Sequence, residues 1–114
     1  MVVRMQHTLA NILSVLKPDE LVAIRGDSEI EITEPIVEST RDLEPGGVFV
    51  ARTGQIVDGH DFIPQAIEKG AAAIVGEKPL TDLAVPYVQV TDPQQIMGRL
   101  AAAYFGFPSR HLHV

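Results

Sequence analysis

The sequence contains no cysteine. Disulfide scaffolds and zinc sites built from thiolates are therefore excluded, and a reducing cytoplasm is compatible with this composition. Long apolar runs are also missing, because none reaches the roughly 18 residues that a membrane-spanning helix needs. Near the N-terminus, Arg4, Gln6 and His7 interrupt the apolar core that a signal peptide requires. We therefore expect a cytoplasmic protein that has no membrane partner.

Several catalytic sequence motifs are missing as well. The loop that wraps nucleotide phosphates, Gly-x-x-x-x-Gly-Lys-Ser/Thr, does not occur, and neither does Gly-x-Ser-x-Gly or His-Glu-x-x-His. The four histidines lack the spacing of a metal site: His7, His60, His111 and His113. We attribute the two-residue spacing of His111 and His113 to chance. The sequence thus predicts no catalytic residue, no metal ligand and no cofactor site in this chain.

The composition is that of one globular domain. The chain has 114 residues, of which 46% are hydrophobic, and this content is too high for a disordered segment. Its formal net charge of −6 argues against nucleic acid and anionic membranes as partners, since both carry negative charge.

A short helix is predicted near the start of the chain. Residues 1–7 are expected to form a disordered start. Thr8 is a suitable N-cap, and apolar residues follow it at helical spacing. The helix is expected to end at Lys17, because a residue before proline, here Pro18, is disfavoured in the α region.

Residues 22–37 predict extended structure. Strands 22–25 and 29–33 are expected to form a hairpin across Gly26-Asp27-Ser28, which is a turn sequence. Pro35 interrupts this pattern, and Ile36-Val37 restarts an extended segment.

Beyond this point, strands and helices are predicted to alternate. The expected elements are strand 48–51, helix 61–69, strand 71–75, strand 87–90, a helix from Asp92 to Gly106 followed by Pro108, and a further strand that begins at Leu112. Such alternation is typical of a parallel sheet covered by helices. We therefore predict an α/β fold with a mixed, largely parallel sheet of about five strands and helices on both faces.

The stretch from Ser39 to His60 is organised around its short apolar strand. Pro45-Gly46 leads into the strand as a turn, and glycines and hydroxyls flank it. The stretch resembles the N-terminal domain of the Mur ligases, the ATP-dependent enzymes that add amino acids to the peptidoglycan precursor. The matching residues are Ser39-Thr40-Arg41, Pro45-Gly46, Val48-Phe49-Val50-Ala51, Gly54, Asp58-Gly59-His60 and Phe62-Ile63. Two positions depart from the family pattern, because Ser39 replaces Asp and Thr40 replaces Ser.

The end of the chain carries the resemblance further. Tyr104-Phe105-Gly106, Pro108-Ser109 and Leu112 are similar to the branch of the family that adds the third residue, meso-diaminopimelate or L-lysine. In that branch this segment leads through one strand into the ATP phosphate loop. The resemblance therefore implies that residues 8–114 form a UDP-sugar-binding N-terminal domain, truncated before the ATP-binding domain.

This resemblance also implies a division of labour. The N-terminal domain would hold the uridine diphosphate end of UDP-N-acetylmuramoyl-L-alanyl-D-glutamate. The central and C-terminal domains of the same enzyme would bind ATP and Mg²⁺ and bring in the amino acid. Two alternatives stay open: the N-terminal domain of the ligase that adds D-alanyl-D-alanine, and a free-standing nucleotide-binding or scaffolding module with no catalytic role.

Carried over position by position, the resemblance implies a set of site residues. The uridine contacts fall on Thr40, Gln55, Ile56 and Val57, with the backbone from Gly54 to Val57 facing the diphosphate.

A second group of residues is expected to border or support that site. Val37 or Glu38 would border the uracil. Arg41 is assigned either to a salt bridge with Glu44 or Asp58 or to a phosphate contact. Asp58 and His60 are predicted to fix the turn into the next helix, with Asp58 accepting backbone hydrogen bonds.

Overall fold

A computed structural model describes residues 8–52 and 58–112 of the chain. The predicted disordered start, 1–7, lies outside the described residues. Within these two ranges, no helix combines the length and apolar character needed to cross a membrane.

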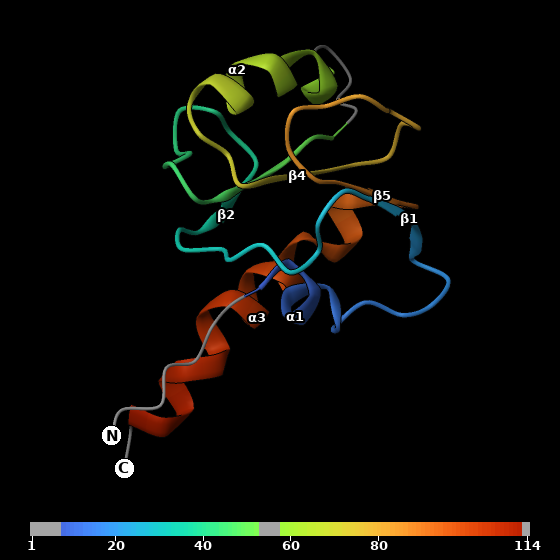
Figure 1. Ribbon diagram of the computed structural model, residues 1–114. Coiled ribbons are helices and arrows are strands. Elements are labelled where there is room, and N and C mark those ends of the chain that lie inside the picture. The colour runs from blue at the N-terminus through green and yellow to red at the C-terminus, as the bar shows by residue number, and fades with distance from the viewer. Residues whose placement is uncertain (1–7, 53–57, 113–114) are drawn as a thin grey trace.

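A single five-stranded sheet forms the centre of the molecule (Figure 1). Its strands are β1 (Leu21–Arg25), β2 (Ile36–Val37), β3 (Val48–Val50), β4 (Ala73–Gly76) and β5 (Tyr87–Val90), in the spatial order β1-β5-β4-β3-β2. Strands β2, β3, β4 and β5 run parallel to one another, and β1 runs antiparallel to β5. The prediction of a mixed, largely parallel sheet is confirmed.

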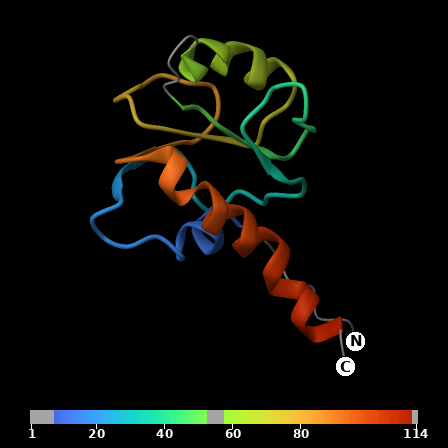
Figure 2. The same ribbon diagram turned by 180° about the vertical axis from the view of Figure 1, so that it is seen from behind.

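Helices cover both faces of the sheet, as predicted (Figures 1 and 2). On one face lies α2 (Ile63–Glu68), preceded by the 3₁₀ turn η1 (Gly59–Phe62). The other face carries α1 (Leu9–Leu13) and the long α3 (Pro93–Leu112). Because each face is covered, β3 and β4 contain no polar side chain, and all of their residues are buried.

Two apolar clusters fill the spaces between these layers. The cluster under α1 and α3 includes Val50 and Val75, and the cluster under α2 includes Phe49 and Ile74. Neighbouring residues of one strand thus serve opposite faces. Burying each such side chain contributes about 1.5–3 kcal/mol, so the two clusters together hold the sheet in place.

The helix caps follow the local sequence. The Thr8 hydroxyl accepts a hydrogen bond from the Asn11 backbone nitrogen at 3.1 Å, which confirms it as the N-cap of α1. Asp92 accepts from the Gln94 nitrogen at 3.1 Å and precedes Pro93, the first residue of α3. At the end of α2, Gly70 adopts a positive φ of 97°, as expected of a residue that terminates a helix.

The predicted hairpin between 22–25 and 29–33 is wrong. Strand β1 pairs with β5 instead, and the segment after it hydrogen-bonds to the start of α1, where the Leu9 nitrogen donates to the Ile30 carbonyl at 2.9 Å. An ion pair between Glu20, just before β1, and Arg99 on α3 helps to hold β1 beside β5. The position of β1 in the sheet therefore depends on contacts with β5 and α3, which are distant in the sequence.

Two helix ends also differ from the prediction. Helix α1 ends at Leu13, before Lys17, because the Ser14 hydroxyl donates to the Asn11 carbonyl at 2.6 Å and competes with the helical ladder. Helix α3 continues past Gly106 and Pro108 to Leu112, so the strand expected to begin at Leu112 is wrong at that residue. Gly and Pro lower helix propensity locally, but a helix already nucleated and packed at its start can extend through them.

Candidate functional site

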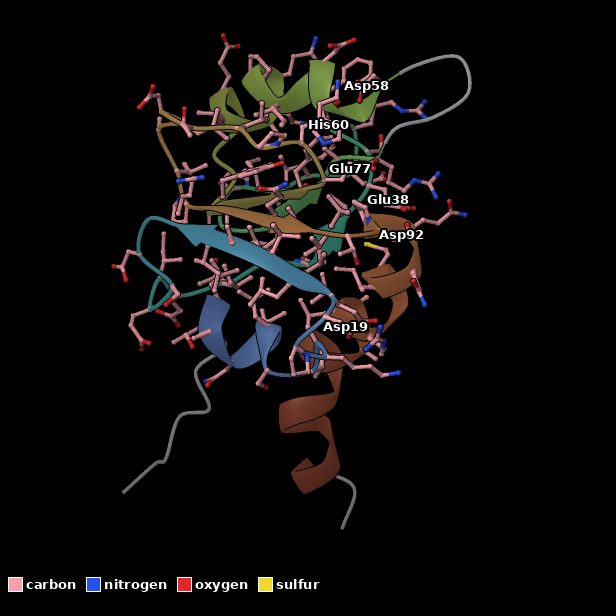
Figure 3. All side chains as sticks on the ribbon, turned by 90° about the vertical axis from the view of Figure 1, so that its right-hand side faces the viewer. Asp19, Glu38, Asp58, His60, Glu77 and Asp92 are labelled. Atoms are coloured by element: carbon pink, nitrogen blue, oxygen red, sulfur yellow. The ribbon has the colours of Figure 1, made fainter. Side chains whose placement is uncertain are left out.

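One edge of the sheet gathers the segments that follow its parallel strands. Glu38 follows β2, Arg52 lies two residues beyond β3, Glu77 follows β4, and Asp92 lies two residues beyond β5. Because the carboxyl ends of neighbouring parallel strands meet at one edge, these residues lie along the same side of the molecule; Figure 3 shows Glu38, Glu77 and Asp92 there, together with Asp58 and His60. In open α/β sheets, this edge is the usual place for a ligand.

A cavity of about 290 Å³ opens at this edge, beside β2 and β3. Four polar residues and two aromatic rings line it: Glu38, Ser39, Thr40, Arg41, Phe49 and Phe62. The combination of a few converging polar groups with apolar walls is typical of small-molecule sites. The structure therefore brings together the predicted site residues Glu38, Thr40 and Arg41.

Local hydrogen bonds shape the polar wall of the cavity. The Ser39 hydroxyl accepts from the Arg41 backbone nitrogen at 3.2 Å, and the Ser39 carbonyl accepts from the Asp42 nitrogen at 3.1 Å. The Thr40 carbonyl accepts from Lys69 at the end of α2. Leu43, only 2% exposed, anchors the end of this turn in the core. The backbone of the turn is thus fixed by its own bonds.

The predicted residues Gly54, Gln55, Ile56 and Val57 lie outside the described residues. The chain on either side of them is held together, because the Gly59 nitrogen donates to the Arg52 carbonyl at 2.6 Å. Arg52 also forms an ion pair with Glu38, with 3.1 Å between Nε and Oε2. Arg52 is therefore paired with the wall of the cavity.

A network around Asp58 fixes the turn into η1 and α2. Its Oδ1 atom accepts from the His60 backbone nitrogen at 2.9 Å and lies 2.7 Å from His60 Nδ1, and its Oδ2 atom pairs with Lys78. Asp58 thus accepts the backbone hydrogen bond expected of it, and the support of a ligand site by Asp58 and His60 stays a prediction.

His60 joins this turn to the segment after β4. Its side chain is only 3% exposed, and its Nε2 atom accepts from the backbone nitrogens of Glu77 at 3.1 Å and Lys78 at 3.4 Å. Backbone N–H groups can only donate, so Nε2 is the acceptor of these bonds, and Nδ1 faces the Asp58 carboxylate. Both ring nitrogens are engaged, and this Asp–His pair therefore has no open nitrogen for acid–base chemistry.

The surroundings shift the pKa of three groups in this network. The pKa of Asp58 is strongly lowered, first by the hydrogen bond from Lys78 and then by those from His60. The same contact raises the pKa of Lys78. Burial raises the pKa of Tyr87 to about 12, and its hydroxyl donates to the Lys78 carbonyl at 2.6 Å. Asp58 and Lys78 are thus held charged, and Tyr87 neutral, at ordinary pH.

Arg41 does not make the salt bridge predicted for it. Within 8–52 and 58–112, no ion pair joins Arg41 to Glu44 or Asp58. Asp58 is already engaged by Lys78, which comes from the turn after β4. Arg41 lines the cavity instead, so the alternative assignment, a phosphate contact, stays a prediction.

Sequence reasoning missed the aromatic walls of the cavity. Phe49 and Phe62 were named only among the residues that carry the family resemblance, and Phe49 is only 1% exposed. Both rings nevertheless contribute to the cavity lining. The signal that could have found them is their position, since each lies close to the edge where β2 and β3 terminate.

Two other cavities are larger, at about 430 and 450 Å³, and flank the segment 80–86. The second is lined mostly by apolar side chains, including Ile63, Ile67 and Leu83. Neither lies beside β2 and β3. We favour the smaller cavity as the candidate site because polar side chains converge in its wall and because it lies at the carboxyl ends of parallel strands.

No group of three or more His, Cys, Asp or Glu residues that could hold a metal ion is found in the described part of the chain. The sequence also has no Gly-x-x-x-x-Gly-Lys-Ser/Thr loop for nucleotide phosphates.

Comparisons with known proteins place these features in one family. The sequence profile described as "Mur ligase family, catalytic domain" matches residues 38–105, which include the cavity-lining turn and strands β3 to β5. The chain is 39% identical, over 90% of its length, to the UDP-N-acetylmuramoyl-L-alanyl-D-glutamate--2,6-diaminopimelate ligase of Alkaliphilus metalliredigens. It is 41% identical, over 93% of its length, to the protein of the same name from Bacteroides fragilis.

A solved structure has a similar fold. It is the UDP-N-acetylmuramoylalanyl-D-glutamyl-2,6-diaminopimelate--D-alanyl-D-alanyl ligase from Acinetobacter baumannii, which matches 87% of this chain with a TM-score of 0.68 and 23% identity. This chain covers 21% of that structure, and it also spans about a fifth, 21%, of each of the two relatives above.

Proposed function

Since the chain belongs to the Mur ligase family, we propose that it is a domain that binds the uridine diphosphate end of a UDP-N-acetylmuramoyl-peptide. The proposal extends to residues 8–114 as a UDP-sugar-binding domain of a ligase of the peptidoglycan precursor. In that ligase, the bound nucleotide positions the far end of the substrate for a reaction elsewhere.

The observation that carries this proposal is the cavity beside β2 and β3. Thr40, to which the family resemblance assigns a uridine contact, lies in its wall together with Glu38 and Arg41. A hydroxyl can both donate and accept, which suits the edge of a uracil ring. The aromatic rings of Phe49 and Phe62 offer apolar surface against which a base can lie.

The size of the cavity indicates how much of the substrate it takes. Its volume of about 290 Å³ is near the lower end of the roughly 300–1,000 Å³ of ligand sites. A uridine fits this range better than a complete sugar nucleotide with its peptide. The uridine contacts of Gln55, Ile56 and Val57, and a diphosphate contact of the backbone from Gly54 to Val57, remain part of the proposal and lie outside the described residues.

The reaction itself is assigned to the longer ligase. The sequence has no Gly-x-x-x-x-Gly-Lys-Ser/Thr loop, and we propose that ATP and Mg²⁺ bind to the parts of the ligase that correspond to the remaining length of the relatives. The substrate, the central and C-terminal domains, ATP and Mg²⁺ are then the partners of the whole enzyme. No step of the chemistry is assigned to Asp58, His60 or Lys78.

The proposed ligase adds the third amino acid of the peptide. The relatives at 39% and 41% identity are both named as ligases of 2,6-diaminopimelate. The alternative is the ligase that adds D-alanyl-D-alanine, because the structure from Acinetobacter baumannii is named as a D-alanyl-D-alanyl ligase. At 23% identity, that structure supports only the shared fold. We therefore retain the third-residue ligase as the first candidate.

Titration of the 114-residue chain with UDP tests this function. We expect weak, saturable binding by calorimetry or ligand-observed NMR. Thr40→Ala should weaken it about fivefold, because a hydrogen bond of roughly 1 kcal/mol is lost. Thr81→Ala, an exposed threonine far along the chain, is the matched control and should bind as the unmodified chain does. A folded chain that shows no response to UDP at millimolar concentration would contradict the proposal.

A further inference from the structure

The ion pair between Arg52 and Glu38 lies beside the cavity, and the fold alone does not account for it. The two side chains are 41% and 38% exposed, and 3.1 Å separates Nε of Arg52 from Oε2 of Glu38. Exposed pairs of this kind add little to stability, because solvent screens them and both side chains lose freedom. Glu38 itself is part of the cavity wall. The pair therefore places a guanidinium group at the rim of the candidate site.

The ion pair with Glu38 leaves most N–H donors of the Arg52 guanidinium available to a ligand. A guanidinium carries five N–H donors in one plane, and the contact with Glu38 is made through Nε. The donors on the two terminal nitrogens are not used by this contact. Their fork geometry matches the oxygens of a phosphate, which they can bind in pairs.

Acidic side chains at this edge of the sheet repel an anionic ligand, so a cation beside the cavity favours its binding. The chain has a net charge of −6, and Asp58, Glu77 and Asp92 lie along the same edge (Figure 3). Two lysines are already engaged, since Lys78 pairs with Asp58 and Lys69 donates to the Thr40 carbonyl. The arginines beside the cavity are the remaining basic groups of this part of the described chain.

We infer that Arg52 is the residue that selects the diphosphate of the bound uridine nucleotide over the uncharged nucleoside. In the unliganded chain, Glu38 holds the guanidinium at the rim of the cavity. When the nucleotide binds, the terminal nitrogens of Arg52 contact its phosphate oxygens. This inference rests on the proposed function, because it concerns the same site.

The ratio of the affinities for UDP and uridine measures this selection directly. Both ligands are titrated separately into the 114-residue chain and followed by NMR, which also reports whether each variant is folded. We expect the unmodified chain to prefer UDP. Arg52→Gln should reduce the ratio roughly tenfold, the typical effect of losing a hydrogen bond to a charged group. Arg52→Lys, which keeps the charge but not the fork, should retain part of the preference.

Arg25→Gln is the matched control for the loss of one positive charge. Arg25 is exposed and pairs with Tyr87 at the start of β5, so it lies toward the opposite edge of the sheet. Its replacement should leave the ratio within about twofold, because screening weakens charges beyond roughly 8–10 Å.

The outcomes separate this inference from the proposed function. If uridine and UDP bind and Arg52→Gln leaves their ratio unchanged, the inference is overturned while the proposed function stands. The inference is likewise overturned if Arg41→Gln alone abolishes the preference, because the selecting group is then Arg41. If neither ligand binds to the folded chain, it is the proposed function that fails.

Discussion

The Nε2 atom of His60 accepts a hydrogen bond from the Glu77 backbone nitrogen at 3.1 Å. This contact joins the turn that leads into α2 to the segment that follows β4. Because the same ring also hydrogen-bonds Asp58, one buried histidine holds together two neighbouring segments at the edge of the sheet that carries the candidate site.

Replacing His60 by alanine should destabilise the chain. Two buried or half-buried backbone N–H groups, those of Glu77 and Lys78, lose the acceptor that they use in the native structure. We expect a loss of about 1–3 kcal/mol in the free energy of unfolding, measured by urea denaturation. Glu68→Ala on the exposed face of α2 is the control and should change the free energy by less than about 0.5 kcal/mol. Equal stability of the two variants would contradict the role given to His60.

Gly76→Ala tests how tightly the same region is packed. A Cβ atom at this position would lie 2.8 Å from His60 Nε2 and 2.5 Å from the Tyr87 hydroxyl oxygen. Both groups are held by their own hydrogen bonds, so they cannot move away without loss. Thermal unfolding should reveal a destabilisation of about 1–3 kcal/mol, the usual cost of overpacking. Gly98→Ala, where nothing lies within 4 Å, should be neutral or stabilising because alanine favours the helix.

The lowered pKa of Asp58 predicts a loss of stability in acid. A carboxylate whose pKa is lower in the folded than in the unfolded state stabilises the fold above its unfolded value of roughly 4. As the pH falls below that value toward the folded pKa, this contribution disappears. Asp58→Asn should therefore be less stable than the unmodified chain at pH 7, and the difference should shrink below about pH 4. A difference that is independent of pH would show that the Asp58 charge is not responsible.

Tyr87 predicts the opposite dependence, at alkaline pH. Burial raises its pKa to about 12, so the neutral phenol stabilises the fold below the unfolded pKa of roughly 10. This contribution should be lost as the pH rises from about 10 toward 12. Tyr87→Phe removes the hydrogen bond to Lys78 and should cost about 0.5–1.5 kcal/mol at pH 7. Unfolding curves at pH 9 and pH 11 should show a steeper loss for the unmodified chain than for Tyr87→Phe.

The parts of the fold that the sequence predicted correctly depend on local chemistry. Thr8 and Asp92 cap their helices through hydrogen bonds to residues two or three positions away. Continuous apolar runs such as Val48–Val50 indicated strands covered on both faces. The turn held by Asp58 and His60 was also predicted, because an Asp side chain bonds to the backbone two residues on.

Long-range contacts account for what the sequence did not predict. Strand β1 had a turn sequence after it, yet it pairs with β5, more than 60 residues away in the chain. Likewise, Asp58, one of the two partners predicted for Arg41, forms its ion pair with Lys78. No local sequence pattern indicates this pairing. The rings of Phe49 and Phe62 line a cavity beside β2 and β3, and the pairing of these two strands cannot be read from a local sequence pattern.

Chemical-shift mapping with UDP tests the central claim most directly. The backbone amides of the isotopically labelled 114-residue chain are followed by NMR while UDP is added. We predict that the largest shifts among the described residues fall on 38–41 and on Arg52, around the cavity beside β2 and β3. Shifts confined to the cavities that flank 80–86, or no shifts at millimolar UDP, would contradict the account.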